Sequence, residues 1–132
     1  MKQSVNRILE LTTHKQVGRL DEWLGVNSET FIRWRHGSGH SVEIIDISVS
    51  AEHRRQGFGR GLVQALLTKL LHDETKTVYA ITRASNLIAQ EFYEALKFRA
   101  CPLRDFYKDE PLADGKRYTD AIMYIWDVGA LI

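Results

Sequence analysis

Arginine and glycine are concentrated in one short segment, residues 52–61, which reads EHRRQGFGRG. Its arginines are Arg54, Arg55 and Arg60, and its glycines are Gly57, Gly59 and Gly61. Glycine leaves backbone amides open to a ligand, and arginine adds positive charge around them. In a turn that leads from a strand into a helix, those amides and the helix dipole attract anions. The segment therefore predicts a site for a phosphate or a diphosphate.

The spacing of the glycines fits other phosphate loops less well. A dinucleotide fingerprint needs G-x-G-x-x-G and a later acidic residue, but the third glycine here comes one residue early. No lysine of the Walker type follows. A turn without a ligand, surrounded by solvated arginines, is the structural alternative. A position after a buried strand argues against that alternative, because open sheets bind ligands at such strand ends.

The residues on either side predict the strand and helix that would position this segment. Residues 41–50, SVEIIDISVS, are rich in β-branched side chains and predict a central strand covered on both faces. From Gly59 to His72, leucine and valine recur every three or four residues, which predicts a helix with its apolar stripe on the sheet. The anion site would then lie where the strand ends and the helix begins.

A second strand and helix follow in the same order. Residues 75–83, TKTVYAITR, predict the strand, and Ser85 or Asn86 caps a helix that runs to about Lys97. The expected buried side of that helix consists of Ile88, Phe92, Ala95 and Leu96.

The two ends of the chain add strands. In the first forty residues, VNRILELT, GRLDEWLGV and SETFIRWRH predict three strands, and AIMYIWDV predicts the last one. Between them, CPLRDFYKDEPLADGKRYTD indicates a short strand and then a loop. This order predicts a single α/β or α+β domain over residues 1–132, with a parallel strand pair joined by a right-handed crossover.

Composition limits the partners of the protein. Eighteen Lys and Arg against seventeen Asp and Glu leave a formal charge of +1 in 132 residues, so we expect neither nucleic acid nor a membrane as a partner. A single cysteine, Cys101, and the lack of a signal-like or long apolar segment favour a soluble, cytoplasmic protein. Cys101 is expected to be a small buried residue. The five histidines have no metal-ligand spacing, so we expect lone surface histidines and no metal.

Two segments resemble one enzyme family. IDISVSAEHRRQGFGRGLVQALL resembles the acyl-CoA signature of the GNAT N-acetyltransferase superfamily, whose pattern Q/R-x-x-G-x-G/A is met by Arg54, Gly57 and Gly59. SNLIAQEFYEALKFR resembles the next segment of that superfamily, in which an Asn opens a helix that ends in a phrase like FYEKLGF. The resemblance covers roughly residues 41–100. It implies a GNAT-like, mostly antiparallel mixed sheet that contains a parallel splayed pair and is flanked by helices.

The resemblance also implies acetyl-CoA as co-substrate. Amides of the Arg55–Arg60 loop would hold the diphosphate, and the backbone of Ile47 and Val49 would pair with the pantetheine arm. The strand that ends at Val49 would splay from the strand around residues 78–81. The expected coenzyme-binding residues are Ile47, Val49, Arg54, Arg55, Gln56, Gly57, Phe58, Gly59, Arg60 and Asn86.

Acetyl transfer to an amine needs a neutral amine, a stabilised oxyanion and a proton for the departing thiolate. Asn86 and Tyr93 are seven residues apart, so in a helix they lie within about twenty degrees of each other. Tyrosine, with a pKa of about 10, stays protonated and can donate to a thiolate whose own pKa is about 8.5. The helix pattern alone also allows Tyr93 to be an aromatic at the edge of the core. The resemblance implies that Tyr93 is the general acid.

A strand carboxylate is the candidate base. Glu43 lies six residues before Val49 and is expected to share a strand face with Ile45, Ile47 and Val49. It would act directly or through water. Asp46 is the rival and is expected on the opposite face. For both residues, a solvated or ion-paired strand carboxylate is the structural alternative.

The amine acceptor, a small molecule or a protein, is left open. The superfamily usually places two helices after its first strand, but only about forty residues precede the signature strand here, so one or both helices are shortened or missing. The acceptor wall would come from Trp23, Trp34 and Arg33, from the 102–118 loop, or from a second subunit in a homodimer.

The acidic residues of the 102–118 loop mildly favour a cationic amine, and they are Asp105, Asp109, Glu110 and Asp114. A peptide, a polyamine and a small amino compound all fit that chemistry. A module that binds acyl-CoA or another phosphate ligand without turnover is the competing function.

Overall fold

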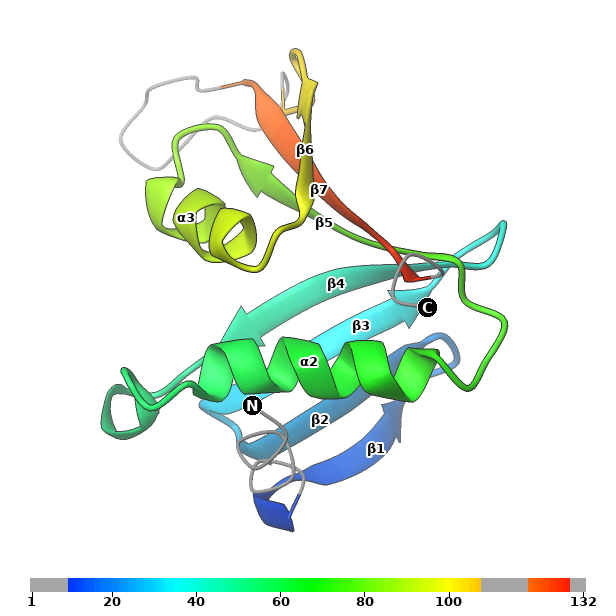
Figure 1. Cartoon of the computed structure of the whole chain (residues 1–132), viewed down its shortest axis with the longest axis vertical. Coiled ribbons are helices and arrows are strands. Elements are labelled where there is room, and N and C mark those ends of the chain that lie inside the picture. Colours follow the sequence, from blue (N-terminus) through cyan, green and yellow to red (C-terminus); the bar gives the residue numbers. More distant parts are fainter. Residues whose placement is uncertain (1–9, 108–118, 129–132) are drawn as a thin grey trace. The chain divides into compact units, whose positions relative to one another are not determined.

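The structure, a computed structural model, describes residues 10–107 and 119–128 (Figure 1). Seven strands form a mixed sheet in the order β1-β2-β3-β4-β5-β7-β6. The chain divides into two compact units. Among the described residues, the first unit holds 10–78 and 127–128, and the second holds 79–107 and 119–126. The expected central position of the signature strand, β4, is confirmed.

The first unit is an antiparallel meander of four strands with a helix on one face (Figure 1). Its elements are β1 (Thr13–Val17), β2 (Asp21–Asn27), β3 (Thr30–His36), β4 (Ser41–Ser48), the 3-10 helix η1 (Ala51–His53) and the helix α2 (Phe58–Leu70). The predicted sequence of strand, turn and helix around residues 52–61 is therefore confirmed. Helix α2 starts one residue earlier than expected and ends two residues earlier.

The core of the first unit lies where α2 packs on the sheet. Most of the predicted leucine and valine stripe is buried, with Leu62, Val63, Leu66, Leu67 and Leu70 on the helix. Leu71, which was expected to continue the stripe, lies just past the helix and is exposed. The buried strand residues beneath are Leu24, Ile32, Trp34, Val42 and Ile44. The register explains this set, since residues opposite each other in an antiparallel ladder share a face and the ladder aligns Leu24 with Ile32 and Trp34 with Ile44.

The opposite face of the same strands is charged. Asp21 on β2 accepts hydrogen bonds from two arginines of β3, with Arg33 Nε at 2.9 Å and Arg35 Nε at 2.6 Å. The ladder then places Arg35 opposite Glu43 and Arg33 opposite Asp46 on β4. This face is therefore a row of alternating charges rather than an apolar surface, and the prediction that β4 is covered on both faces was wrong.

A β-bulge in β4 also changes which side chains share a face. The ladder aligns Trp34 with Ile44 but Arg33 with Asp46, so Ile45 is an extra residue on β4. Glu43 and Asp46 consequently lie on the same face, while Ile47, aligned with Ile32, lies on the other. The expectation that Glu43 shares a face with Ile47 and opposes Asp46 was wrong, because it assumed strict alternation along the strand.

The amino-terminal strands differ from the prediction at one position. The first strand is Thr13–Val17, whereas Glu10 and Leu11 are helical and residues 1–9 lie outside the described part of the chain. A short turn at Gly18, with φ +70°, connects β1 directly to β2. In the described residues no helix separates these two strands.

The second unit contains most of β5 (Thr77–Arg83), α3 (Leu87–Ala95), β6 (Arg99–Leu103) and β7 (Ala121–Asp127). β6 and β7 pair antiparallel. Helix α3 buries a different side than predicted, because Tyr93 is 4% exposed whereas Ile88 is 83% exposed and Ala95 is also exposed. No helix in the described residues is long and apolar enough to cross a bilayer.

The charged face of the first unit generates a prediction about acid stability. Hydrogen bonds from Arg35 and then Arg33 lower the pKa of Asp21 from 3.8 to about 2. A depressed pKa contributes stability that is present above pH 3.8 and is lost as the pH falls toward 2. We expect Asp21→Asn to be less stable than the natural protein at neutral pH and to lose less stability between about pH 4 and pH 2.

Urea unfolding at a series of pH values measures both effects. If the two proteins gave parallel curves of unfolding free energy against pH, the arginines would not hold the Asp21 carboxylate as the structure shows.

Candidate functional site

The candidate anion site is the connection between β4 and α2. Gly57 precedes the helix with φ +79°, and no side chain caps the first turn. A Cβ atom added at Gly57 would meet no protein atom within 4 Å. The first amides of a helix have no partner within the helix, so those of Phe58, Gly59 and Arg60 are available to a ligand. The dipole of this 13-residue helix adds a positive potential at the same point.

The arginines of the loop surround these amides with charge. Arg54, Arg55 and Arg60 are all exposed. Arg55 has φ +62°, a left-handed conformation that is unusual for a residue other than glycine. Arg54 turns back, and its Nε donates to the carbonyl oxygen of Val49 at 3.2 Å. The loop therefore combines open amides, a helix dipole and exposed positive charges, which is the chemistry that binds a diphosphate.

The remaining predicted residues of the loop hold its shape. The side-chain amide of Gln56 donates to the carbonyl oxygen of Glu52 at 2.7 Å. Phe58 is buried, so its ring belongs to the core and only its backbone is left for a ligand.

A second set of predicted residues meets at a cavity of about 400 Å³ in the first unit. Its lining consists of Lys15, Trp23, Asn27, Ser28, Phe31, Arg33 and Asp46. Trp23 and Phe31 stack with ring centroids 5.9 Å apart, and Gly25 between them has no room for a side chain. Lys15 Nζ lies 4.5 Å from the centroid of the Trp23 ring. The structure thus brings together Trp23, Arg33 and Asp46, which the sequence had suggested separately.

Trp34, by contrast, is fully buried in the core under α2. The prediction that it helps to form an acceptor wall was wrong, because the strand alternation that exposes Arg33 turns Trp34 inward. Phe31 was not singled out from sequence, although its alternation with Ile32 placed it on the same face as Arg33.

The histidines have more contacts than expected. The prediction of lone surface residues was wrong for His14 and His36, which both contact the carboxylate of Glu22, and for His40, which lies 3.8 Å from Glu74. Burial raises the pKa of Glu22, but the two histidines outweigh this effect and hold the pKa below its ordinary value. His53 contacts Thr30 and Ser50.

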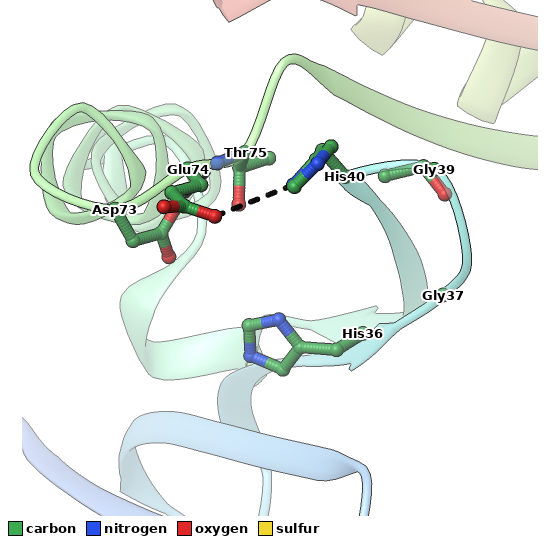
Figure 2. Close-up of a pocket in the computed structure, with 8 residues that line it drawn as sticks. His36, Gly37, Gly39, His40, Asp73, Glu74 and Thr75 are labelled. Carbon is green, nitrogen blue, oxygen red and sulfur yellow. Dashed lines mark hydrogen bonds and ion pairs between the residues drawn. The ribbon is translucent and has the colours of Figure 1, made fainter.

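A polar cavity of about 500 Å³ lies beside His36 and His40 (Figure 2). The turn between β3 and β4 forms one side, and the connection after α2, with Asp73 and Glu74, forms the other. This connection follows the last turn of α2, whereas the anion loop precedes the first, so the cavity is separate from that loop. In the part of the chain that the structure describes, no three His, Cys, Asp or Glu side chains are grouped to hold a metal ion.

In the second unit, Asn86 caps α3. Its Oδ1 accepts a hydrogen bond from Ala89 N at 3.1 Å, which confirms the predicted cap and selects Asn86 over Ser85. Asn86 has φ −88° and ψ 82°, outside the helical region. The helical spacing that predicted a shared flank with Tyr93 therefore does not apply to Asn86.

Tyr93 belongs to an aromatic cluster of the second unit. Its ring centroid lies 5.3 Å from that of Phe98 and 5.4 Å from that of Tyr124. The Tyr124 hydroxyl donates to Glu94 Oε1 at 3.3 Å, and burial, followed by the charge of Glu94, raises the pKa of Tyr124. Tyr124 was not predicted from the sequence, because the pattern of the last strand does not distinguish it from the other apolar residues of that strand.

The acidic residues predicted after β6 are only partly described. The Asp105 carboxylate accepts a hydrogen bond from Thr119 Oγ1 at 2.9 Å, and Asp105 N donates to Asp120 Oδ1 at 2.9 Å. Asp105 therefore holds the residues just after β6 against those just before β7. Asp109, Glu110 and Asp114 lie outside the described residues.

Comparisons with known proteins agree with this arrangement. A model of the acetyltransferase (GNAT) family matches residues 17–98. The [ribosomal protein bS18]-alanine N-acetyltransferase of Escherichia coli K12 is 35% identical over 80 residues, which cover 61% of this chain and 51% of that protein. The Haemophilus ducreyi protein of the same name is 29% identical over 83 residues, which cover 63% and 56%. The chain thus spans about half the length of the curated relatives it matches.

Solved structures extend the likeness to the fold. The ribosomal-protein-S18-alanine N-acetyltransferase from Escherichia coli has a TM-score of 0.65 and 25% identity over 96% of this chain and 86% of that chain. A Bacillus subtilis acetyltransferase solved in complex with CoA has a TM-score of 0.65 and 22% identity over 96% and 83%.

The open space at Gly57 generates a prediction. Asparagine tolerates a positive φ, so Gly57→Asn should fold, but its side chain would cover the amides of the loop. We expect Gly57→Asn to bind coenzyme A at least about tenfold more weakly, as measured by isothermal titration.

Gly18→Asn is the matched control, since Gly18 has φ +70° and equally open surroundings but lies between β1 and β2. Equal affinity of the two variants for coenzyme A would remove the loop from the binding site.

Proposed function

This chain belongs to the acetyltransferase (GNAT) family, and we propose that it transfers an acetyl group from acetyl-CoA to the amine of an acceptor. The observation that carries the proposal is the open first turn of α2. Its amides have no capping side chain, a glycine with open surroundings precedes them, and three exposed arginines lie around them. The diphosphate of the coenzyme has the negative charge and the acceptor oxygens that these amides and arginines can bind.

The contacts of the loop suggest a role for each predicted residue. We propose that backbone amides from Arg55 to Arg60 hold the diphosphate and that Arg54, Arg55 and Arg60 balance its charge. Gln56 and Phe58 then act through the backbone, since their side chains bind Glu52 and the core. The pantetheine arm is proposed to run along the backbone of Ile47 and Val49. Because Arg54 already holds the Val49 carbonyl, the arm either uses the Val49 amide or displaces that guanidinium.

The proposed reaction is direct attack. The neutral amine nitrogen attacks the thioester carbonyl carbon, a tetrahedral oxyanion forms, and the C–S bond then breaks. The departing thiolate takes a proton from the Tyr93 hydroxyl, and a carboxylate accepts the proton that the amine loses. Glu43 is the proposed base, and Asp46 is its rival on the same face. Asn86 is proposed to contact the coenzyme while its Oδ1 caps α3.

A protein amine is the acceptor class that the relatives favour. Two bacterial relatives are named for acetylating an alanine of ribosomal protein bS18, so we propose a protein amino terminus, with alanine as the first candidate. The cavity beside Trp23 and Arg33 is the proposed acceptor wall, because Asp46 offers an amine a carboxylate there. A small-molecule amine is the alternative.

Two broader statements belong to the same proposal. We propose that the two units act as one domain, since the family match at residues 17–98 runs across their boundary. We also propose a cytoplasmic location, because the single cysteine of the sequence cannot form an internal disulfide.

Release of free coenzyme A thiol in the presence of different amines tests the proposed reaction. We expect acetyl-CoA to be consumed with a peptide that begins with alanine, and more slowly or not at all with the same peptide blocked at its amino terminus. Spermidine and free amino acids complete the panel and decide between the two acceptor classes. Binding of acetyl-CoA without thiol release for any amine would favour the competing function, a binding module without turnover.

The aromatic cluster provides a matched pair of variants for the general acid. Tyr93→Phe and Tyr124→Phe each remove one hydroxyl and keep a ring in the same cluster. General acid catalysis contributes about 10²- to 10⁴-fold, so we expect kcat to fall by at least about a hundredfold in Tyr93→Phe and little in Tyr124→Phe. The KM for acetyl-CoA should stay near the natural value in both. A Tyr93→Phe enzyme with full kcat from pH 6 to 9 would remove Tyr93 from the chemistry.

A further inference from the structure

His53 lies between the end of β4 and residues 54–57, and two hydroxyl groups meet at its ring. Thr30 Oγ1 is 3.0 Å and Ser50 Oγ is 2.9 Å from His53 Nδ1, and Thr30 Oγ1 and Ser50 Oγ are 3.0 Å apart. Thr30 is fully buried and Ser50 is nearly so. A buried polar cluster of this kind is stable only when its groups satisfy one another, so it fixes their relative positions.

One assignment of the hydrogen atoms satisfies both hydroxyls and leaves the 3.0 Å approach of Thr30 Oγ1 to His53 Nδ1 as a close contact without a hydrogen. The Ser50 amide donates to Thr30 Oγ1 at 3.0 Å, the Thr30 hydroxyl donates to Ser50 Oγ, and the Ser50 hydroxyl donates to His53 Nδ1. In this assignment Nδ1 of His53 accepts the hydrogen bond. Thr30 begins β3 and Ser50 follows β4, so the cluster continues the pairing of these strands beyond their last backbone bonds.

The other side of the His53 ring packs on the helix. Its centroid lies 4.5 Å from that of Phe58, the buried first residue of α2. His53 and Phe58 are the residues on either side of the four-residue loop 54–57. Their contact closes the base of the loop, while the cluster with Thr30 and Ser50 ties that base to the sheet.

These contacts hold the loop in its binding conformation before a ligand arrives. Arg55 and Gly57 both have positive φ, and a free chain would abandon such a conformation at a non-glycine residue. Ordering a loop during binding costs affinity, so a fixed base improves binding without touching the ligand. We propose that His53 is a positioning residue for the coenzyme, which sets the anion loop by joining the start of β3 to the start of α2. This inference rests on the proposed function, because it takes the diphosphate of acetyl-CoA as the ligand of the loop.

Two pairs of variants separate positioning from mere stabilisation. His53→Phe keeps a ring on Phe58 and removes Nδ1, and Thr30→Val removes the hydroxyl at nearly constant volume. Thr30→Ser restores that hydroxyl, and His72→Phe is a histidine control just beyond the other end of α2. The affinity for acetyl-CoA is measured by isothermal titration, and steady-state kinetics give kcat and both KM values.

We expect His53→Phe and Thr30→Val to bind acetyl-CoA about tenfold more weakly, with a matching rise in its KM. The kcat at saturating acetyl-CoA and the KM for the amine should stay within about twofold of the natural values, and Thr30→Ser and His72→Phe should bind normally. Normal affinity in His53→Phe and Thr30→Val would overturn the inference. A fall in kcat as large as the rise in KM would overturn it too.

Should either variant fail to fold, Ser50→Ala removes only the hydroxyl that contacts His53 and is judged by the same criterion. A natural protein that does not bind acetyl-CoA would refute the proposed function itself. Normal binding by both the natural protein and the variants would refute only the role of His53.

Discussion

The amino end of α2 is the constraint on which the rest of the site depends. A helix that begins without a capping side chain leaves amides that must be satisfied by water or by a ligand. The helix itself cannot shift to relieve them, because its leucine stripe is buried on the sheet and each buried leucine contributes about 1.5–3 kcal/mol. The loop must then reach this fixed point from the end of β4, with Arg55 and Gly57 in left-handed conformations. An anion is the natural partner of such a turn.

The sheet of the first unit has two faces with different tasks. The face under α2 is apolar and holds the helix in place, whereas the other face carries Asp21, its two arginines and the candidate bases. The bulge at Ile45 brings Glu43 and Asp46 to the charged face together. The rings of Trp23 and Phe31, which stack beside Gly25, add an apolar part to the cavity on this charged face. The same strand register therefore positions both the proposed coenzyme site and the proposed acceptor wall.

Much of this arrangement was predictable from local sequence. The turn at the glycine and arginine segment, the buried leucines of α2 and the Asn86 cap each depend on a few neighbouring residues, and these three structural predictions are confirmed. The face of Glu43 was not predictable, since one extra residue in β4 reverses the alternation and only the partner strand reveals it. The buried side of α3 was missed for a related reason. Tyr93, rather than the more apolar Ile88, stacks on Tyr124 of a distant strand.

The central claim is that the loop between β4 and α2 holds the diphosphate of acetyl-CoA, and NMR tests it most directly. Backbone amide shifts of the isotope-labelled protein are followed during titration with acetyl-CoA and, separately, with pantetheine, which lacks the diphosphate. The account predicts that acetyl-CoA moves the amides of residues 55–60 the most and that pantetheine leaves them nearly unchanged. Binding of acetyl-CoA that leaves the amides of Gly57 and Gly59 in place would contradict it.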